Sequence, residues 1–195
     1  MINEVRNKWN EFPELKSCHH FLYDDLYRNG KNFVLFMGIN PGEPKKDWVQ
    51  FPEGLCEESR YINFRKDNNS LPKSSKRWFG IIEKMVPDFF GVIQSELFFW
   101  SSPDIKTLNN RIPDWKNSKI LDFCTKANIW LIKNYNIDLV IVTSVSDIDL
   151  FCKKYKLKLI EKFNSKFNSR RLVEKYISDI GTTWLFCLHP TGTLG

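Results

Sequence analysis

Asn32-Phe33-Val34-Leu35-Phe36-Met37 is the stretch that decides the fold, and Gly38-Ile39-Asn40-Pro41-Gly42 follows it without a break. After its first residue the run is continuously apolar, with β-branched and aromatic side chains, which favours a short strand covered on both faces. Three further runs have the same character, at residues 96–100, 138–143 and 183–188. Short buried strands of this kind predict a mainly parallel sheet.

Helical stretches are expected between these runs. They lie at about residues 71–87, 117–135 and 147–156, the last continued by 168–178, and an N-terminal helix at about 13–28 precedes the first strand. Strands that alternate with helices predict an α/β fold, here a three-layer α/β/α sandwich with a four-stranded, mainly parallel sheet. Residues 43–75 are rich in Pro and Gly and lack periodic apolar residues, and a long irregular segment of this kind is usually functional or disordered.

Length and composition limit the possibilities. With 195 residues, 42% of them apolar, the chain can bury one core, so we expect a single domain over residues 1–195. The sequence stops at Gly195, directly after a Gly-rich turn where an α/β unit would continue into a helix, which is typical of a truncated chain. The net charge of +6 favours a polyanionic partner such as nucleic acid or an anionic membrane surface, although ordinary solvated surface explains it too.

Several classes of protein fit the sequence poorly. No apolar stretch approaches the roughly 20 residues that span a bilayer. The first six residues lack the apolar core of a signal peptide, so we expect an intracellular, cytoplasmic protein, nucleoid-associated if it is bacterial. The five cysteines are scattered and form no Cys-x-x-Cys pair, which argues against a disulfide framework or a zinc ribbon. Cys18-His19-His20 has no second cluster of metal ligands to accompany it, so we expect no metal.

Two short motifs follow expected strands. Gly38-Ile39-Asn40-Pro41-Gly42 comes after the first strand and His189-Pro190-Thr191-Gly192 after the last. Open α/β sheets bind ligands beyond the carboxyl ends of their strands, so the two motifs are placed to line one pocket. Each has a plainer interpretation, since Asn-Pro-Gly is a good turn sequence and a single His after a strand is more often structural. Their joint placement favours a functional site.

The motifs resemble those of a known family. Residues 34–42 resemble the first signature of the uracil-DNA glycosylase superfamily, particularly its mismatch-specific uracil/thymine branch. Residues 188–192 resemble the second signature, His-Pro-Ser-Gly, with Thr191 in place of the usual Ser, and residues 76–82 resemble a helix start of the same branch. The resemblance implies a DNA glycosylase that hydrolyses the N-glycosidic bond of a flipped-out base without metal or cofactor.

The resemblance also implies roles for individual residues. Asn40 would hold the attacking water with its amide, and His189 would donate a hydrogen bond to the base oxygen on which charge develops. The expected base-binding residues are Gly38, Ile39, Phe51 and Ser101. The expected DNA-binding residues are Pro41, Gly42, Lys45, Lys46, Pro190, Thr191, Gly192 and Leu194.

Several points stay open. Phe51 is the expected stacking partner of the base, with Trp48 and Phe64 as competitors. Residues 98–103, the expected end of the second strand, offer no amide such as several uracil-reading relatives have there, so uracil, mismatched thymine, a deaminated purine or a larger modified base are all candidates. A basic segment before the last strand either contacts DNA or faces solvent. It contains Lys153, Lys154, Lys156, Lys158, Lys162, Lys166, Arg170 and Arg171.

Two alternatives compete with a monomeric glycosylase acting on DNA. The first is a non-catalytic DNA-binding module of the same fold that recognises a modified base. The second is an unrelated α/β protein that binds a nucleotide or another phosphate compound, but the sequence contains neither Gly-x-Gly-x-x-Gly nor Gly-x-x-x-x-Gly-Lys-Ser/Thr.

Overall fold

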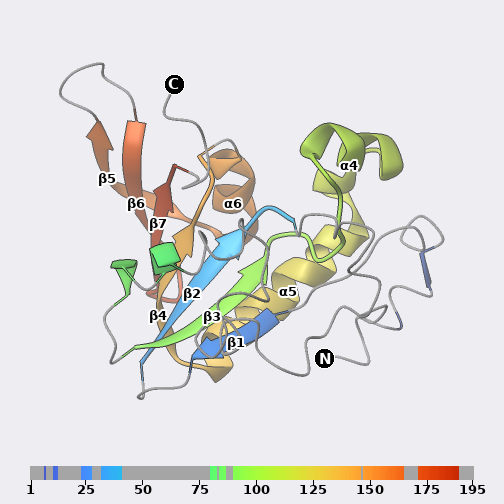
Figure 1. Ribbon diagram of the computed structural model, residues 1–195. Helices are drawn as coiled ribbons and strands as arrows, with labels where there is room; N and C mark the ends of the chain where they lie inside the picture. Colours follow the sequence, from blue (N-terminus) through green and yellow to red (C-terminus); the bar gives the residue numbers. More distant parts are fainter. Residues whose placement is uncertain are drawn as a thin grey trace.

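The computed structural model describes residues 7, 11–12, 23–27, 32–40, 80–82, 84–86, 90–145, 147–164 and 171–188. Figure 1 shows how the helices and strands in these residues are arranged. In chain order they are β1 (Tyr23–Tyr27), β2 (Phe33–Gly38), β3 (Gly91–Glu96), α4 (Ile105–Arg111), the 3-10 helix η3 (Trp115–Asn117), α5 (Lys119–Asn134), β4 (Ile137–Val142), α6 (Ile148–Tyr155), β5 (Lys158–Asn164), β6 (Arg171–Ile177) and β7 (Thr183–Cys187).

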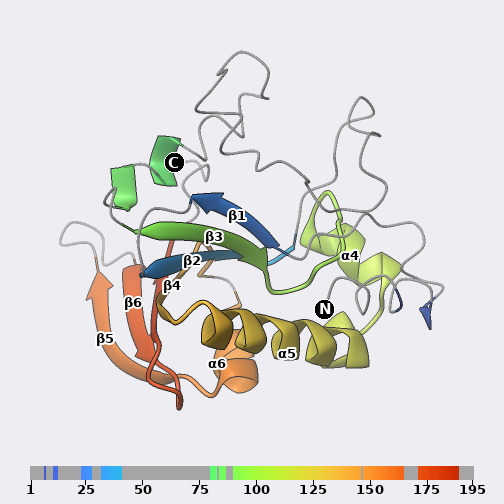
Figure 2. The same ribbon diagram turned by 90° about the horizontal axis from the view of Figure 1, so that it is seen from below.

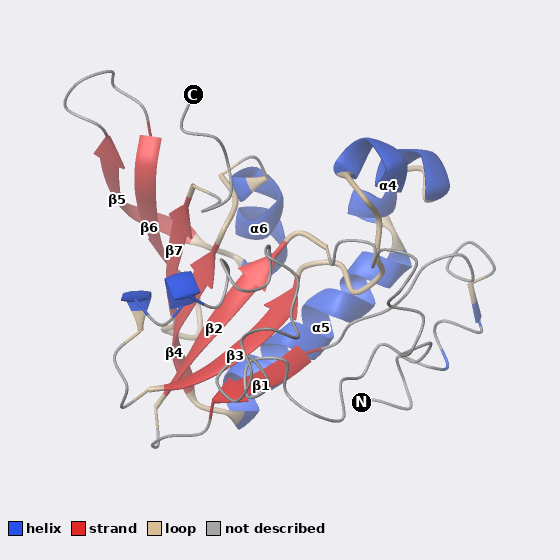
Figure 3. Ribbon diagram, viewed as in Figure 1, coloured by secondary structure: helices blue, strands red, loops and turns tan. Residues whose placement is uncertain are grey.

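The described strands form one mixed sheet in the order β1-β3-β2-β4-β7-β6-β5. Its central strands β3, β2, β4 and β7 are parallel. β1 pairs antiparallel with β3 at one edge, and β6 and β5 extend the other edge in antiparallel fashion (Figure 3). The α/β class is therefore as expected, but the expected four-stranded sheet is too small, since the described residues alone form seven strands.

Helices cover both faces of the sheet. Figure 2 shows α5 and α6 together under one face, and the short helical pieces at residues 80–82 and 84–85 over the other. The larger core lies on the α5 and α6 side and takes Leu35 and Met37 from β2. The smaller core lies on the opposite side, where Val34 and Phe36 pack against Ile82. Alternate residues of β2 thus enter different cores, which explains why its sequence is continuously apolar.

Two helices were predicted correctly from the sequence, at 117–135 and 147–156. α5 begins after Ser118, whose hydroxyl accepts from the backbone N–H of Leu121 at 3.1 Å, and its buried residues recur at helical spacing along one side. It ends at Asn134, and Asn136 with φ of 49° turns the chain into β4. α6 ends at Tyr155, followed by Lys156 in the left-handed conformation.

Three predictions of local structure were wrong. The helix expected at 13–28 includes β1, and the helix expected at 168–178 is largely β6. In both cases hydrogen bonding to an existing sheet edge outweighs local helical preference. The second strand, expected at 96–100, is Gly91–Glu96 instead. Most of the helix expected at 71–87, and the irregular stretch 43–75, lie outside the described residues. No helix in the described part of the chain has the length and apolar character that crossing a membrane requires.

Candidate active site at the carboxyl ends of the parallel strands

The first motif begins at the carboxyl end of β2. Gly38 is the last residue of that strand. Two backbone hydrogen bonds continue its pairing with the segment that follows β3. The N–H of Leu97 donates to the Gly38 carbonyl at 2.9 Å, and the N–H of Phe98 donates to the Ile39 carbonyl at 2.8 Å. The segment that follows β3 therefore runs beside the motif and brings its own residues to the same edge of the sheet.

Asn40 is oriented by Ser102. Its Nδ2 donates to Ser102 Oγ at 3.1 Å and to the Ser102 carbonyl at 3.3 Å. Ser102 Oγ donates its single hydrogen to the Asp104 carbonyl at 2.7 Å, so toward Asn40 it acts only as an acceptor. Both groups that face the amide are thus acceptors, which fixes its NH₂ on their side. The amide oxygen is therefore directed away from Ser102.

The loop that holds Ser102 is anchored by the start of α4. Asp104 is the N-cap of this helix, and its side chain accepts from the backbone N–H of Thr107 at 2.7 Å. This hydrogen bond lowers the pKa of the Asp104 carboxyl from its ordinary value, because the bond favours the charged form. A short chain of contacts therefore connects the helix cap to Ser102 and through it to Asn40.

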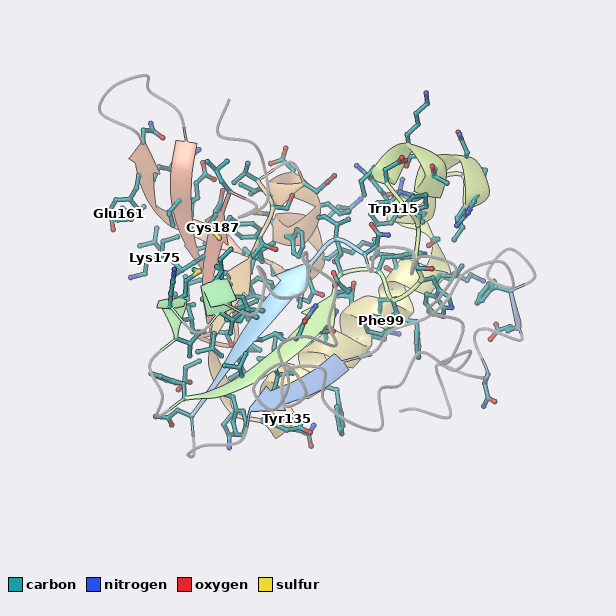
Figure 4. The ribbon with its side chains drawn as sticks, viewed as in Figure 1. Phe99, Trp115, Tyr135, Glu161, Lys175 and Cys187 are labelled. Carbon is teal, nitrogen blue, oxygen red and sulfur yellow. The ribbon has the colours of Figure 1, made fainter. Side chains whose placement is uncertain are left out.

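The apolar run after β3 is a packing segment. Phe98, Phe99 and Trp100 are completely buried, and Phe98 packs on Trp115 with ring centroids 5.2 Å apart. Figure 4 shows Phe99 beside α5 and Trp115 beside α4, at the end of the sheet where the motif lies. The sequence interpretation mistook this run for a strand, because a short buried apolar stretch looks the same in either role. Its burial gives the adjoining serines a rigid support.

Glu96 lies at the true end of the second parallel strand. It is paired with Gly38 across β2 and β3, and a β-carbon built on Gly38 would collide with Oε2 of Glu96 and lie 3.2 Å from Oε1. Only a glycine permits this close approach of a carboxylate to the motif backbone. The second strand was expected to end without the amide that several uracil-reading relatives carry there, and its true end carries a carboxylate rather than an amide. The polar triplet Gln94-Ser95-Glu96, which separates two apolar runs, was the signal available in the sequence.

A buried polar network supports this strand end from behind. Asn128 of α5 donates to the Glu96 carbonyl at 2.9 Å and to the Tyr155 hydroxyl at 3.1 Å, while its Oδ1 accepts from Ser95 Oγ at 2.8 Å. Asn128 and Ser95 are both completely buried. Satisfied buried polar groups of this kind specify one arrangement of the elements that they join. The network ties β3, α5 and α6 together directly beneath the candidate site.

The second motif follows β7, which reaches the same sheet edge. Cys187, its last residue, donates to the Val142 carbonyl at 3.5 Å, and burial raises the pKa of its thiol. The thiol therefore stays protonated near neutral pH and is a poor nucleophile. His189, Pro190, Thr191, Gly192 and Leu194 lie outside the described residues, as do Pro41, Gly42, Lys45, Lys46 and Phe51.

The expected site residues that are described have different surroundings. Gly38 and Asn40 stand at the strand end together, and Ile39 packs against the larger core. Ser101 is almost completely buried, and the hydroxyl that contacts Asn40 is that of its neighbour Ser102. Sequence reasoning singled out Ser101 and missed Ser102 and Glu96, because it placed the strand end four residues too late.

The basic segment, residues 153–171, is divided between the two ends of the parallel strands, which we call the carboxyl edge and the amino edge of the sheet. α6 runs back from the carboxyl edge, so Lys153, Lys156 and Lys158 lie toward the amino edge, opposite to Asn40. Three lysines of the segment are paired with carboxylates. These pairs are Lys154 with Asp122 at 2.6 Å, Lys156 with Asp179 at 3.7 Å and Lys162 with Glu174 at 3.2 Å. The described part of this segment is therefore a poor candidate for a DNA-binding surface beside the motif.

Comparison with protein-family models and with curated proteins gives no match for this chain. Among the described residues, no three His, Cys, Asp or Glu side chains come together in a way that could hold a metal ion. The described part of the candidate site consists of an oriented amide, a buried carboxylate and a glycine that lets the carboxylate approach.

Proposed function

We propose that this chain is a DNA glycosylase that hydrolyses the N-glycosidic bond of an extruded base, with Asn40 positioning the water. The observation that carries the proposal is the fixed orientation of the Asn40 amide at the carboxyl end of β2. An acceptor held in one direction can hold a water molecule for attack along one line, and such positioning lowers the barrier of a two-molecule reaction. The sandwich fold of the uracil-DNA glycosylase superfamily, extended by antiparallel edge strands, is part of this proposal.

The proposed reaction replaces one bond with another at the sugar. The bond between C1′ and the base nitrogen breaks, its electron pair leaves with the base, and the water oxygen bonds to C1′ while the water gives up a proton. An amide cannot take that proton, so Asn40 orients the water and the proton passes to solvent or to the departing base. In this proposal His189, which follows β7 in the sequence, donates a hydrogen bond to the base as negative charge develops on it.

Single-turnover excision tests this assignment. Oligonucleotides that carry uracil, mismatched thymine, hypoxanthine and oxidised or alkylated bases are incubated with excess protein, and abasic sites are revealed by alkali. For any base that is excised, Asn40→Ala and His189→Ala are each expected to lower the rate by about 100- to 1000-fold, the scale for one preorganised group. Binding to the same oligonucleotides should change much less.

Asn134→Ala is the matched control. It removes the same type of side chain, but from the exposed end of α5, at the amino edge of the sheet. Its excision rate should equal that of the wild type. Wild-type protein that binds a modified base tightly and releases none would support the non-catalytic reader instead. Unchanged excision in both motif variants would place the active site elsewhere.

A further inference from the structure

β5 is the last strand at one side of the sheet, and Figure 3 shows it outermost, beside β6. In the described part of the chain it pairs with β6 alone, and every one of its residues, Lys158–Asn164, is exposed. A strand that is paired on one side only presents a row of free backbone N–H and C=O groups on the other. We call this unpaired row the open side of β5, and another extended chain can bind there.

Large apolar side chains stand on both faces of β5. Leu159 and Phe163 are 47% and 46% exposed, and Ile160, at a bulge between them, is 55% exposed. Leu159 pairs with Tyr176 of β6. Phe163 pairs with Val173, three residues earlier in the same regular strand, so its side chain lies on the opposite face of the sheet from Leu159. The side chains of an added strand also alternate between the two faces and can therefore cover both.

The charge around β5 favours an acidic partner. The basic segment, residues 153–171, contains eight Lys or Arg and one Glu, which gives it a net charge of +7, whereas the whole chain carries +6. On β5 itself Lys158 has no carboxylate partner among the described residues, and Lys162, although paired with Glu174, is 46% exposed. The exposed carboxylate of β5 is Glu161. Two copies that met along this strand would bring their basic segments together and repel each other, whereas a segment rich in Asp or Glu is attracted.

The open side of β5 also distinguishes between kinds of acidic partner. The hydrocarbon of a bilayer offers no hydrogen bonds to unpaired N–H and C=O groups, so an open strand does not enter it. DNA would meet the lysines, but its phosphates leave the aliphatic side chains of Leu159 and Ile160 without an apolar contact. An extended peptide satisfies all three features of β5, because its backbone bonds to the open side, its apolar side chains cover those of β5, and its carboxylates face the lysines.

We infer that the open side of β5 is a docking site for an extended acidic segment of a partner protein, which adds to the sheet as one more strand. Bulges and lysines both hinder unselective pairing with an exposed strand. β5 has register shifts at Ile160 and after Phe163 in addition to its lysines, so the carboxylates that meet the lysines select the partner. Three strands, β4, β7 and β6, separate β5 from β2. The inference is therefore independent of the proposed excision at Asn40.

Titration with labelled peptides tests the inference. The probe is a peptide in which pairs of Glu alternate with pairs of Val, so that each face of the extended chain carries both residue types. A second peptide has Lys in place of Glu, and a third keeps the side chains of the probe but has an ester oxygen in place of every backbone N–H. The wild type is expected to bind the probe at least about 10-fold more tightly than either of the others, the scale of losing a few cross-strand contacts or hydrogen bonds.

Hydrogen exchange locates the bound peptide. The backbone N–H groups of residues 158–164 should exchange more slowly when the probe is present, because hydrogen-bonded amides are protected. β1, the strand at the other side of the sheet, is the internal control, since it carries Asp24 and Asp25 and should repel the probe. Its exchange rates should not change.

Lys158→Glu is the test variant, and Lys133→Glu is its matched control. Lys133 is exposed on α5 and, like Lys158, pairs with no carboxylate among the described residues, so both substitutions change the net charge equally and break no ion pair there. Lys158→Glu should weaken binding of the probe by about 3- to 10-fold, the effect of turning one cross-strand attraction into a repulsion. Lys133→Glu should stay within about 2-fold of the wild type, since a distant surface charge contributes little. Thermal unfolding verifies that both variants are folded.

Several results would overturn the inference. Equal affinity for the three peptides, equal weakening by the two variants, or slower exchange at β1 would mean that the probe is not bound as a strand along β5. A dimer of the free protein in sedimentation that Lys158→Glu dissociates would assign β5 to a second copy. Binding to phosphatidylglycerol vesicles or to DNA that is lost in Lys158→Glu, without binding of the probe, would assign it to a lipid surface or to nucleic acid. None of these measurements depends on excision, so failure of the proposed function would leave the inference standing.

Discussion

The hydroxyl of Ser102 determines how Asn40 can act. An isolated asparagine amide can present either its oxygen or its nitrogen to a ligand, and only the oxygen can hold a water by accepting its hydrogen. The hydrogen of Ser102 Oγ is committed to the Asp104 carbonyl, so the hydroxyl and the neighbouring carbonyl both require a donor from Asn40. In the proposed function, Ser102 thus sets the direction of the amide that holds the water.

Ser102→Ala should therefore slow excision without weakening DNA binding. The variant removes one of the two acceptors that hold the amide, and loosened positioning of a reacting group typically costs about 10- to 100-fold in rate. The rate under enzyme excess and the affinity for abasic DNA are the two measurements. Ser178→Ala, which removes a buried hydroxyl near the amino edge of the sheet, is the control and should leave both unchanged. Equal slowing in the two variants would mean a general loss of stability.

At the scale of elements, the site is supported by three segments that meet at Asn128. This residue joins the end of β3 to Tyr155 in α6 from its own position in α5. The same region is packed by aromatic rings, among them Tyr155 against Trp184 at 4.6 Å between centroids. Burial raises the pKa of the Tyr155 phenol above its ordinary value of 10.0, because the charged form cannot be solvated there.

The position of Tyr155 predicts how stability depends on pH in alkaline solution. In the unfolded chain the phenol ionises near pH 10.0, whereas in the folded protein it keeps its proton, so its contribution is complete below that pH and declines above it. For one group the free energy of unfolding should fall by about 1.4 kcal/mol per pH unit.

Denaturant unfolding of the wild type and Tyr155→Phe between about pH 8 and pH 12 measures this contribution. The variant should show a shallower decline above pH 10.0 and the wild-type pH dependence at lower pH. Parallel curves over the whole range would show that the phenol ionises equally in both states.

At the scale of the whole molecule, the carboxyl and amino ends of the parallel strands carry different residues. Parallel strands bring the ends of β2, β3, β4 and β7 together at one edge, and α6 carries the lysines that follow it back to the other. β5, at the outer margin of the sheet where Figure 4 labels Glu161, is exposed at every residue. Among the described residues, the lysines at the end of α6 and the start of β5 therefore lie away from the strand ends that carry Asn40.

The salt dependence of DNA binding should distinguish the two edges. Lys45 and Lys46 follow the first motif closely in sequence, so Lys45→Ala/Lys46→Ala should weaken binding to all sequences and reduce the slope of log K against log salt by about 0.9 for each phosphate that the variant no longer neutralises. Lys153→Ala/Lys158→Ala removes the same charge from the amino edge and should leave the slope unchanged. Fluorescence anisotropy over a salt series gives both slopes. A larger effect of the second pair would place the DNA on the opposite edge.

The sequence alone determined the α/β class, the helices at 117–135 and 147–156, and three of the four parallel strands with the motif after the first. These features depend on local patterns, since helical spacing in α5 and continuous apolar runs in β2, β4 and β7 report burial directly. Asn40 could be assigned to the end of a strand for the same reason, because the run before it stops at Gly38.

Only the tertiary structure decided where β3 ends and which edge segments become strands. β1, β5 and β6 are strands because a partner offers them backbone hydrogen bonds, and such pairing between distant segments leaves no period in the sequence. Within residues 96–100, Glu96 ends β3 and the residues after it form a buried segment. The aromatic packing of Phe98 on Trp115 decides where the strand stops. Glu96 and Ser102 thus acquire their places through contacts with Gly38 and Asn40, which lie more than fifty residues away in the chain.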